Sequence, residues 1–120
     1  MNQIRVIIAD DHMAVRAMLR QLLDSACEVV FETSNGSETV EAVERLQPEL
    51  LLLDIAMPHM DGFEVLRQLK LQGSRTRIIM VSTFSDPAYI REASVLGAEA
   101  YLTKRRMARE LLPCIQRLFA

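Results

Sequence analysis

The chain has 120 residues, of which half are hydrophobic and a quarter are charged, and its formal net charge is −2. This length predicts one domain that can bury a hydrophobic core, and the composition excludes a disordered chain. The slightly acidic charge argues against direct binding of nucleic acid or of an anionic membrane by this domain. No apolar run approaches the length of a membrane span or of a signal peptide, so we expect a soluble, cytoplasmic protein.

Five short apolar runs predict the strands of a sheet. They are residues 3–9, 27–33, 50–53, 77–82 and 98–103. The run at 50–53 consists of four leucines, and a continuous apolar run bounded by turn signals is typical of a strand buried on both faces. The run at 27–33 is more polar, which favours a position at the edge of the sheet.

Apolar residues at helical spacing follow each strand and predict five helices. These stripes are Val15, Met18, Leu19, Leu22 and Leu23; Val40, Val43 and Leu46; Phe63, Leu66 and Leu69; Ile90, Ala93 and Leu96; and Leu111, Leu112, Ile115, Leu118 and Phe119. Asn35 and Asp61 each precede a glutamate by three residues, the spacing of a capping box, and Asp86 precedes a proline, which also predicts a helix start. Pro113 falls inside the fifth helix, where proline costs about 3 kcal/mol, so that helix either starts late or is kinked.

Strands and helices alternate strictly along the chain and are joined by short loops. Strands that are separated by helices must pair in parallel, and right-handed crossovers then cover both faces of the sheet with helices. We therefore predict one doubly wound α/β domain with a five-stranded parallel sheet. Open sheets of this kind bind ligands at the carboxyl ends of their strands.

Polar residues stand at the carboxyl ends of four predicted strands. They are Asp10 and Asp11 after the first strand, Asp54 after the third, Ser82 and Thr83 at the end of the fourth, and Lys104 after the fifth. Three carboxylates at one edge repel one another unless a cation neutralises them, and oxygen ligands favour a hard ion such as Mg²⁺. A lysine and a hydroxyl beside such an ion suit a phosphoryl group, which an aspartate can accept as a nucleophile.

These motifs together resemble the receiver domain of bacterial two-component response regulators, the CheY-like family, over essentially all 120 residues. The resemblance rests on the acid pair, on Asp54 within DIAMPHMDG, on Ser82 after an apolar strand and on Lys104 after the fifth strand. It implies a flavodoxin-like (βα)5 fold with the strand order 2-1-3-4-5.

Two segments are closer to the NarL/FixJ-type subgroup of this family. They are VSTF at residues 81–84 and YLTK at residues 101–104. Members of the subgroup usually carry a helix-turn-helix DNA-binding domain after the receiver. We therefore expect residues 1–120 to be a receiver domain excised from a longer response regulator that controls transcription.

The resemblance also implies the roles of the site residues. Asp54 would be the phosphoacceptor, and Asp11 and Asp54 would be Mg²⁺ ligands. Asp10 would help through water, and the backbone carbonyl of Ala56 would be a further ligand. Lys104 would pair with the phosphoryl oxygens. The phosphoryl donor would be a sensor histidine kinase or a phosphotransfer protein.

Three residues are implied in the conformational switch. Ser82, or Thr83 in competition with it, would follow the phosphoryl group, and Tyr101 matches the aromatic residue that changes rotamer with the hydroxyl. Phosphorylation adds about 1.5 to 2 negative charges. The surface formed by the fourth helix, fifth strand and fifth helix would then change its partners, and a homodimer on phosphorylation is one expected outcome.

The other residues that can ligate metals are given different roles. Cys27 and Cys114 lie far apart and form no CxxC pair, so we expect reduced thiols packed in the core. His12 and His59 flank the site, but the chain has no third histidine and oxygen ligands lie nearby, so we prefer a hard ion to a transition metal. Asp61 is assigned to helix capping.

Three alternative functions fit parts of the pattern. A pseudo-receiver that only binds partners would lack one of the key acids or the lysine, and none is missing. A haloacid-dehalogenase-type phosphatase needs a DxD signature, whereas Asp54 is followed by Ile55 and Ala56. A flavin-binding module would suffer repulsion between FMN phosphate and the acids after the first strand. The sequence therefore favours a signalling switch over an enzyme with an external substrate.

Overall fold

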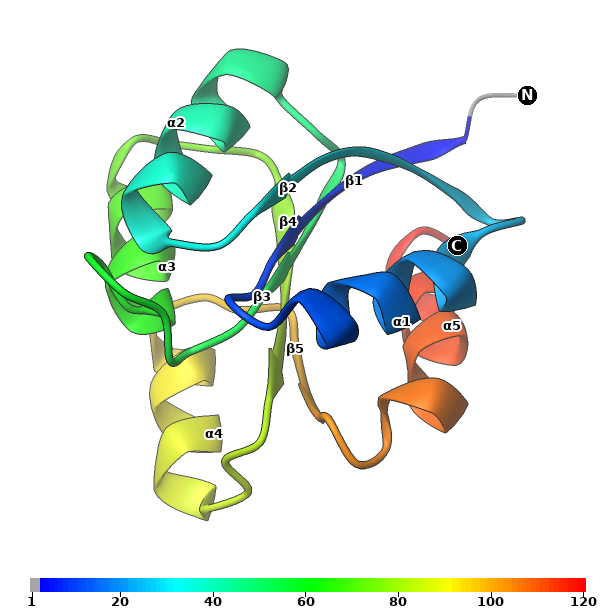
Figure 1. The fold of residues 1–120 in the computed structure, drawn as a ribbon. Coiled ribbons are helices and arrows are strands. Elements are labelled where there is room, and N and C mark those ends of the chain that lie inside the picture. The colour runs from blue at the N-terminus through cyan, green and yellow to red at the C-terminus, as the bar shows by residue number, and fades with distance from the viewer. Residues whose placement is uncertain (1–2) are drawn as a thin grey trace.

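The computed structural model describes residues 3–120 and forms a single five-stranded parallel sheet covered by helices on both faces. The elements in chain order are β1 (Ile4–Ala9), α1 (Met13–Leu23), β2 (Cys27–Thr33), α2 (Gly36–Leu46), β3 (Leu50–Leu53), α3 (Gly62–Leu71), β4 (Arg77–Ser82), α4 (Pro87–Val95), β5 (Ala100–Thr103) and α5 (Met107–Leu118). The strand order is β2-β1-β3-β4-β5, as the sequence predicts. Figure 1 shows α2, α3 and α4 on one side of the sheet and α1 and α5 on the other. Within residues 3–120, no helix is both long and apolar enough to cross a membrane.

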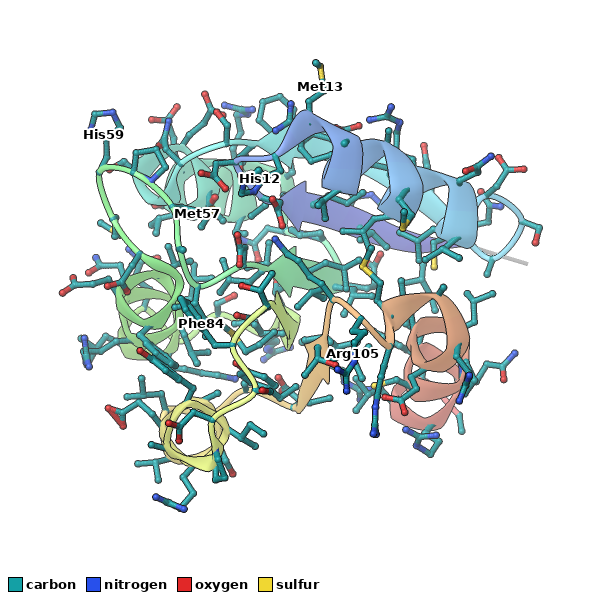
Figure 2. The ribbon with its side chains drawn as sticks, turned by 60° about the horizontal axis from the view of Figure 1, so that its bottom comes forward. His12, Met13, Met57, His59, Phe84 and Arg105 are labelled. Atoms are coloured by element: carbon teal, nitrogen blue, oxygen red, sulfur yellow. The ribbon has the colours of Figure 1, made fainter. Side chains whose placement is uncertain are left out.

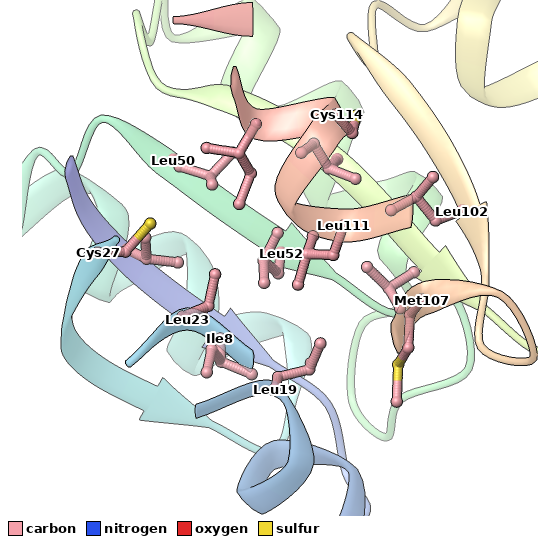
Figure 3. Packing of buried hydrophobic residues seen from close by; sticks show 14 residues of the cluster. Ile8, Leu19, Leu23, Cys27, Leu50, Leu52, Leu102, Met107, Leu111 and Cys114 are labelled. Carbon is pink, nitrogen blue, oxygen red and sulfur yellow. The ribbon is translucent and has the colours of Figure 1, made fainter. Parts of the chain in front are cut away.

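The hydrophobic core consists of two layers, one on each face of the sheet. Successive side chains of a strand point to opposite faces, so Leu50 and Leu52 of β3 join the α1 and α5 layer, while Leu51 and Leu53 join the other. All four leucines are at most 1% exposed. Burial of each stabilises the fold by about 1.5 to 3 kcal/mol. The α1 and α5 layer is shown in Figure 3, where Leu52 packs among side chains of both helices.

Both cysteines lie in the layer between the sheet and helices α1 and α5 (Figure 3). Cys27 and Cys114 are free and buried, and burial raises the pKa of both thiols. Such thiols remain protonated and act as small apolar side chains. The prediction of packed thiols is confirmed.

The three predicted helix starts are confirmed. The side chain of each N-cap residue accepts a backbone N–H: Asn35 from Glu38 at 2.8 Å, Asp61 from Glu64 at 3.0 Å, and Asp86 from Ala88 at 2.8 Å. A cap of this kind contributes about 1 kcal/mol.

The fifth strand begins two residues later than predicted. The N–H of Ala98 donates to the carbonyl of Ala93 and that of Gly97 to the carbonyl of Ser94, which together form a Schellman motif at the end of α4. Gly97 has a φ of 102°, a conformation that favours glycine. Ala98 therefore completes the helix end, and β5 starts at Ala100.

Three helices differ from expectation. In α1 the stripe residue Met18 is 47% exposed. In α4 only Ala93 is fully buried, and the predicted inward residue Ile90 is 39% exposed, because α4 packs beside the short edge strand β5. In α5 the late start is wrong, since the helix begins at Met107 and Pro113 lies within it. Proline has no N–H, so the carbonyl of Arg109 lacks the helical hydrogen bond that residue 113 would otherwise donate. Both residues are exposed, so water can satisfy this carbonyl.

Candidate functional site

The carboxyl ends of β1, β3 and β5 bring three charged side chains into contact. The Nζ of Lys104 lies 2.7 Å from Oδ2 of Asp10 and 3.3 Å from Oδ2 of Asp54. Asp10 is 1% exposed and Asp54 is 3% exposed. Two carboxylates buried this deeply are costly unless a charge compensates them, and Lys104 supplies one positive charge for the pair.

Backbone hydrogen bonds extend the sheet into the site and hold these residues in place. The N–H of Asp54 donates to the carbonyl of Ala9 at 2.9 Å, and the N–H of Lys104 donates to the carbonyl of Ser82 at 2.8 Å. One carboxylate oxygen of Asp54 also accepts the N–H of Ile55 at 2.8 Å. The positions of Asp54 and Lys104 are therefore set by the rigid sheet rather than by a loose loop.

Electrostatics in the site favours a bound cation. Burial, and then the nearby charge of Asp10, raise the pKa of Asp54 to about 6, although Lys104 and the N–H of Ile55 act in the opposite direction. Burial lowers the pKa of Lys104, but its hydrogen bond to Asp10 and the two carboxylate charges outweigh this and raise it above the ordinary value. Lys104 is therefore charged at neutral pH, and the site still carries excess negative charge.

Four residues can offer ligand atoms to one metal ion. One atom each of Asp10, Asp11, His12 and Asp54 lie within 4.8 Å of one another. A magnesium ion binds oxygen at about 2.0 to 2.1 Å, so a group of this size fits one ion with water completing its shell. Ala56, the fourth predicted ligand, is exposed in the loop after β3.

The two histidines differ in their relation to the site. The Nδ1 of His12 lies 3.0 Å from Oδ1 of Asp11 and 3.4 Å from Oδ1 of Asp10. His59 lies on the β3–α3 loop, apart from His12 (Figure 2). The structure thus brings His12 to the acids and leaves His59 outside the cluster.

The two candidate switch hydroxyls, those of Ser82 and Thr83, differ in burial. Ser82 is fully buried, and its Oγ accepts the N–H of Phe84 at 3.1 Å. Thr83 is exposed and lines a groove of about 480 Å³ between α4, β5 and the start of α5. The hydroxyl of Tyr101 donates to the carbonyl of Phe84 at 2.6 Å, and burial raises its pKa. Ser82 and Tyr101 therefore hold the same loop through Phe84.

Aromatic stacking ties this loop to two helices. The ring of Phe84, labelled in Figure 2, stacks on Tyr89 of α4 with centroids 4.8 Å apart. Tyr89 in turn stacks on Phe63 of α3 at 6.0 Å. A movement of the β4–α4 loop must therefore alter the contacts of α4.

Sequence reasoning missed one residue beside the site. The guanidinium of Arg16 donates to the backbone carbonyl of Asp10 at 2.7 Å and to Glu32 at 3.1 Å. Arg16 stands three residues before Leu19 and seven before Leu23, on the side of α1 that faces the protein. A charged residue at core-facing helical spacing was the signal that could have identified it.

Comparison with known proteins establishes the family. Residues 6–116 match the family described as the response regulator receiver domain, so the chain belongs to this family. Chemotaxis protein CheY of Listeria monocytogenes is 32% identical over 115 residues, which cover 95% of this chain and 97% of that protein. The uncharacterized transcriptional regulatory protein YhcZ of Bacillus subtilis is 36% identical over 110 residues, which cover 90% of this chain and 51% of YhcZ.

Solved structures agree with this assignment. The signal receiver domain of a protein assigned as the response regulator NarL from Mycobacterium tuberculosis has a TM-score of 0.93 at 28% identity, covering 98% of this chain and 97% of that one. The predicted CheY-like fold and the resemblance to NarL-type receivers are confirmed. Receiver domains are in general signalling modules rather than enzymes.

Proposed function

We propose that this chain is a phosphorylation-driven switch in which Asp54 accepts a phosphoryl group in a reaction that needs Mg²⁺. The observation that carries the proposal is the buried Lys104, Asp10 and Asp54 cluster at the carboxyl edge of the sheet, in a chain of the receiver family. The phosphoryl donor is a sensor histidine kinase or a phosphotransfer protein.

Each site residue has a distinct task in the transfer. A carboxylate oxygen of Asp54 forms the new O–P bond while the bond between phosphorus and the donor breaks. Lys104, which lies 3.3 Å from Asp54, donates to the phosphoryl oxygens, and Ser82 donates a hydroxyl hydrogen bond from the next strand. When bound, Mg²⁺ would be held by Asp11, Asp54, the Ala56 carbonyl and, through water, Asp10, and it would neutralise phosphoryl charge.

The switch acts through the loop that Ser82 and Tyr101 share. A phosphoryl group on Asp54 attracts the hydroxyl of Ser82. In the unphosphorylated structure this hydroxyl accepts the N–H of Phe84. Loss of that bond changes the loop, and the carbonyl of Phe84 carries the change to the hydroxyl of Tyr101. Tyr101 lines the groove between α4, β5 and α5, so the population of surface conformations shifts there.

The output is control of transcription by a longer cytoplasmic protein that contains this receiver. The similarity to the transcriptional regulatory protein YhcZ, only about half of which this chain spans, supports this part of the proposal. The chain's net charge of −2 supports an output domain, rather than the receiver, as the part that binds DNA.

The test is the intact mass of the chain after incubation with acetyl phosphate, with and without Mg²⁺, for the wild type and for Asp54→Ala. We expect one phosphoryl adduct on the wild type that requires Mg²⁺ and is absent from the variant. A wild-type chain that forms no adduct and does not bind beryllofluoride would contradict the proposal and favour the pseudo-receiver alternative.

A further inference from the structure

We propose that Arg16 is a positioning residue of this site, because it fixes the peptide plane between Asp10 and Asp11 and so directs the carboxylate of Asp11 toward the cation. The inference rests on the proposed function, since it concerns how that site is prepared for Mg²⁺. Arg16 itself does not touch the phosphoryl group or the ion.

The guanidinium of Arg16 joins three elements of the fold. Arg16 belongs to α1, and its side chain is 19% exposed. Its Nη1 donates to the carbonyl of Asp10, the residue after β1, at 2.7 Å, and its Nε donates to Oε1 of Glu32 in β2 at 3.1 Å. The planar guanidinium can satisfy both acceptors at once, which a lysine ammonium cannot do with the same geometry.

The contact with Asp10 completes the fixation of this residue. Its N–H donates to the carbonyl of Thr33 at 3.1 Å, and its carboxylate accepts the N–H of His12 and pairs with Lys104. Arg16 holds the remaining polar group, the backbone carbonyl. The backbone and the side chain of Asp10 are therefore both held in one orientation.

This fixation limits where Asp11 can point. The carbonyl of Asp10 and the N–H of Asp11 belong to one planar peptide unit. By binding this carbonyl, Arg16 fixes the orientation of the peptide plane and so the position of the Asp11 Cα atom. The side chain of Asp11 is 33% exposed, whereas that of Asp10 is 2% exposed, so packing restrains Asp11 much less. Its direction is set by the backbone and by the contact of its Oδ1 with Nδ1 of His12 at 3.0 Å.

The charge and the geometry of Arg16 affect cation binding in opposite directions. A positive charge near the acids repels Mg²⁺, whereas a fixed Asp11 favours it. Removal of an outer partner of a metal ligand typically weakens metal binding about 10- to 100-fold. Arg16→Lys keeps the charge and loses the two-acceptor geometry, so it isolates the positioning effect.

The experiment is calorimetric titration of the unphosphorylated chain with Mg²⁺ at neutral pH. We expect Arg16→Lys to bind Mg²⁺ about tenfold more weakly than the wild type, and its phosphorylation by acetyl phosphate to recover at saturating Mg²⁺. Arg20→Lys is the matched control, because Arg20 pairs with the same Glu32 and forms no contact with Asp10 among the hydrogen bonds of residues 3–120. We expect it to bind Mg²⁺ as the wild type does.

Glu32→Gln provides a second test, because it leaves Arg16 in place and removes the charge that anchors it. We expect a smaller loss of affinity than in Arg16→Lys, and this variant decides the question if Arg16→Lys does not fold. The inference is overturned if Arg16→Lys binds Mg²⁺ as tightly as the wild type, or if Arg20→Lys weakens binding equally. A wild-type chain that binds no Mg²⁺ would instead overturn the metal assignment in the proposed function.

Discussion

At the scale of single residues, Asp54 shows a conflict between stability and function. Burial and the charge of Asp10 raise its pKa from 3.8 to about 6. A carboxyl group with a higher pKa in the folded state binds its proton more tightly there than in the unfolded chain. Asp54 therefore reduces stability as pH rises from its unfolded pKa through its folded pKa, and the full cost is present at neutral pH.

Asp54→Asn should raise the free energy of unfolding at neutral pH, without metal, by about 1 to 3 kcal/mol, because it removes a buried charge and keeps the shape. The gain should shrink as pH falls through 6 and disappear below 3.8, where the wild-type carboxyl is protonated in both states. Urea denaturation across this pH range measures the effect. Asp61→Asn, which removes an exposed carboxylate instead of a buried one, is the matched control. An equal gain at low pH would contradict this explanation.

Mg²⁺ should stabilise the wild-type chain and have no comparable effect on Asp54→Asn. An ion that binds only the folded state adds stability according to its concentration and affinity. The effect should weaken as pH falls through about 6, because protonated Asp54 is a poor ligand. Thermal unfolding with Mg²⁺ or with a chelator measures it. Equal stabilisation of both proteins would place the ion elsewhere.

At the scale of elements, the β3–α3 loop depends on the first residue of α2. A Cβ on Gly36 would lie 1.9 Å from the carbonyl oxygen of Met60 in this loop. The N–H of Gly36 also donates to the carbonyl of Pro58 at 3.4 Å. The loop that follows Asp54 can therefore approach α2 this closely only because the residue is glycine.

Gly36→Ala should lower the free energy of unfolding by about 1 to 3 kcal/mol, the cost of overpacking, although alanine is the better helix former by about 1 kcal/mol. It should also weaken Mg²⁺ binding, because the displaced loop carries Ala56. Urea denaturation and calorimetric titration measure the two effects. A more stable variant, as helix propensity alone predicts, would show that the loop yields without cost.

The β4–α4 loop depends on the hydroxyl of Tyr101. Tyr101→Phe removes its hydrogen bond to the carbonyl of Phe84 and should cost about 0.5 to 1.5 kcal/mol. The ring still packs, so the loss should be local. Hydrogen exchange should become faster in the β4–α4 loop and in α4, while the amides of β3 should be unaffected. Unchanged exchange would mean that aromatic stacking and the hydrogen bond between Phe84 and Ser82 hold this loop without the Tyr101 hydroxyl.

At the scale of the whole molecule, helix α4 exposes apolar surface that a partner could cover. Three large apolar side chains of α4 are exposed, Tyr89 at 38%, Ile90 at 39% and Val95 at 81%, and they point in different directions around the helix. The groove beside α4 is partly lined by Ile90 and Tyr101, so a change in the switch residues changes this surface directly. The dimer on phosphorylation that the family resemblance implies could use this surface.

Sedimentation velocity with and without beryllofluoride and Mg²⁺ tests this dimer. We expect the wild-type chain to sediment faster with the phosphoryl mimic, and Asp54→Ala to remain unchanged. An additional Val95→Glu variant should prevent the shift and still bind beryllofluoride, since Val95 is exposed and lies outside the site. A wild-type chain that remains monomeric with the mimic bound would exclude this dimer for the receiver alone.

The sequence by itself determined the order and type of the elements and the residues that meet at one edge of the sheet. Three strands, Cys27–Thr33, Leu50–Leu53 and Arg77–Ser82, have the predicted bounds, because apolar runs and turn residues are local signals. The meeting of Asp10, Asp54 and Lys104 also follows, because helical crossovers force the strands to be parallel and parallel strands end at the same edge.

Only the tertiary structure decided the properties that depend on distance and burial between remote residues. It showed that burial raises the pKa of Asp54 to about 6, and that Ser82 rather than Thr83 is buried at the strand end. It also showed that Ile90 is partly exposed to solvent and that Arg16 donates a hydrogen bond to the carbonyl of Asp10. Periodicity identifies which face of an element is apolar, but the amount of surface that covers this face, and the partner that each polar atom finds, depend on how the elements pack.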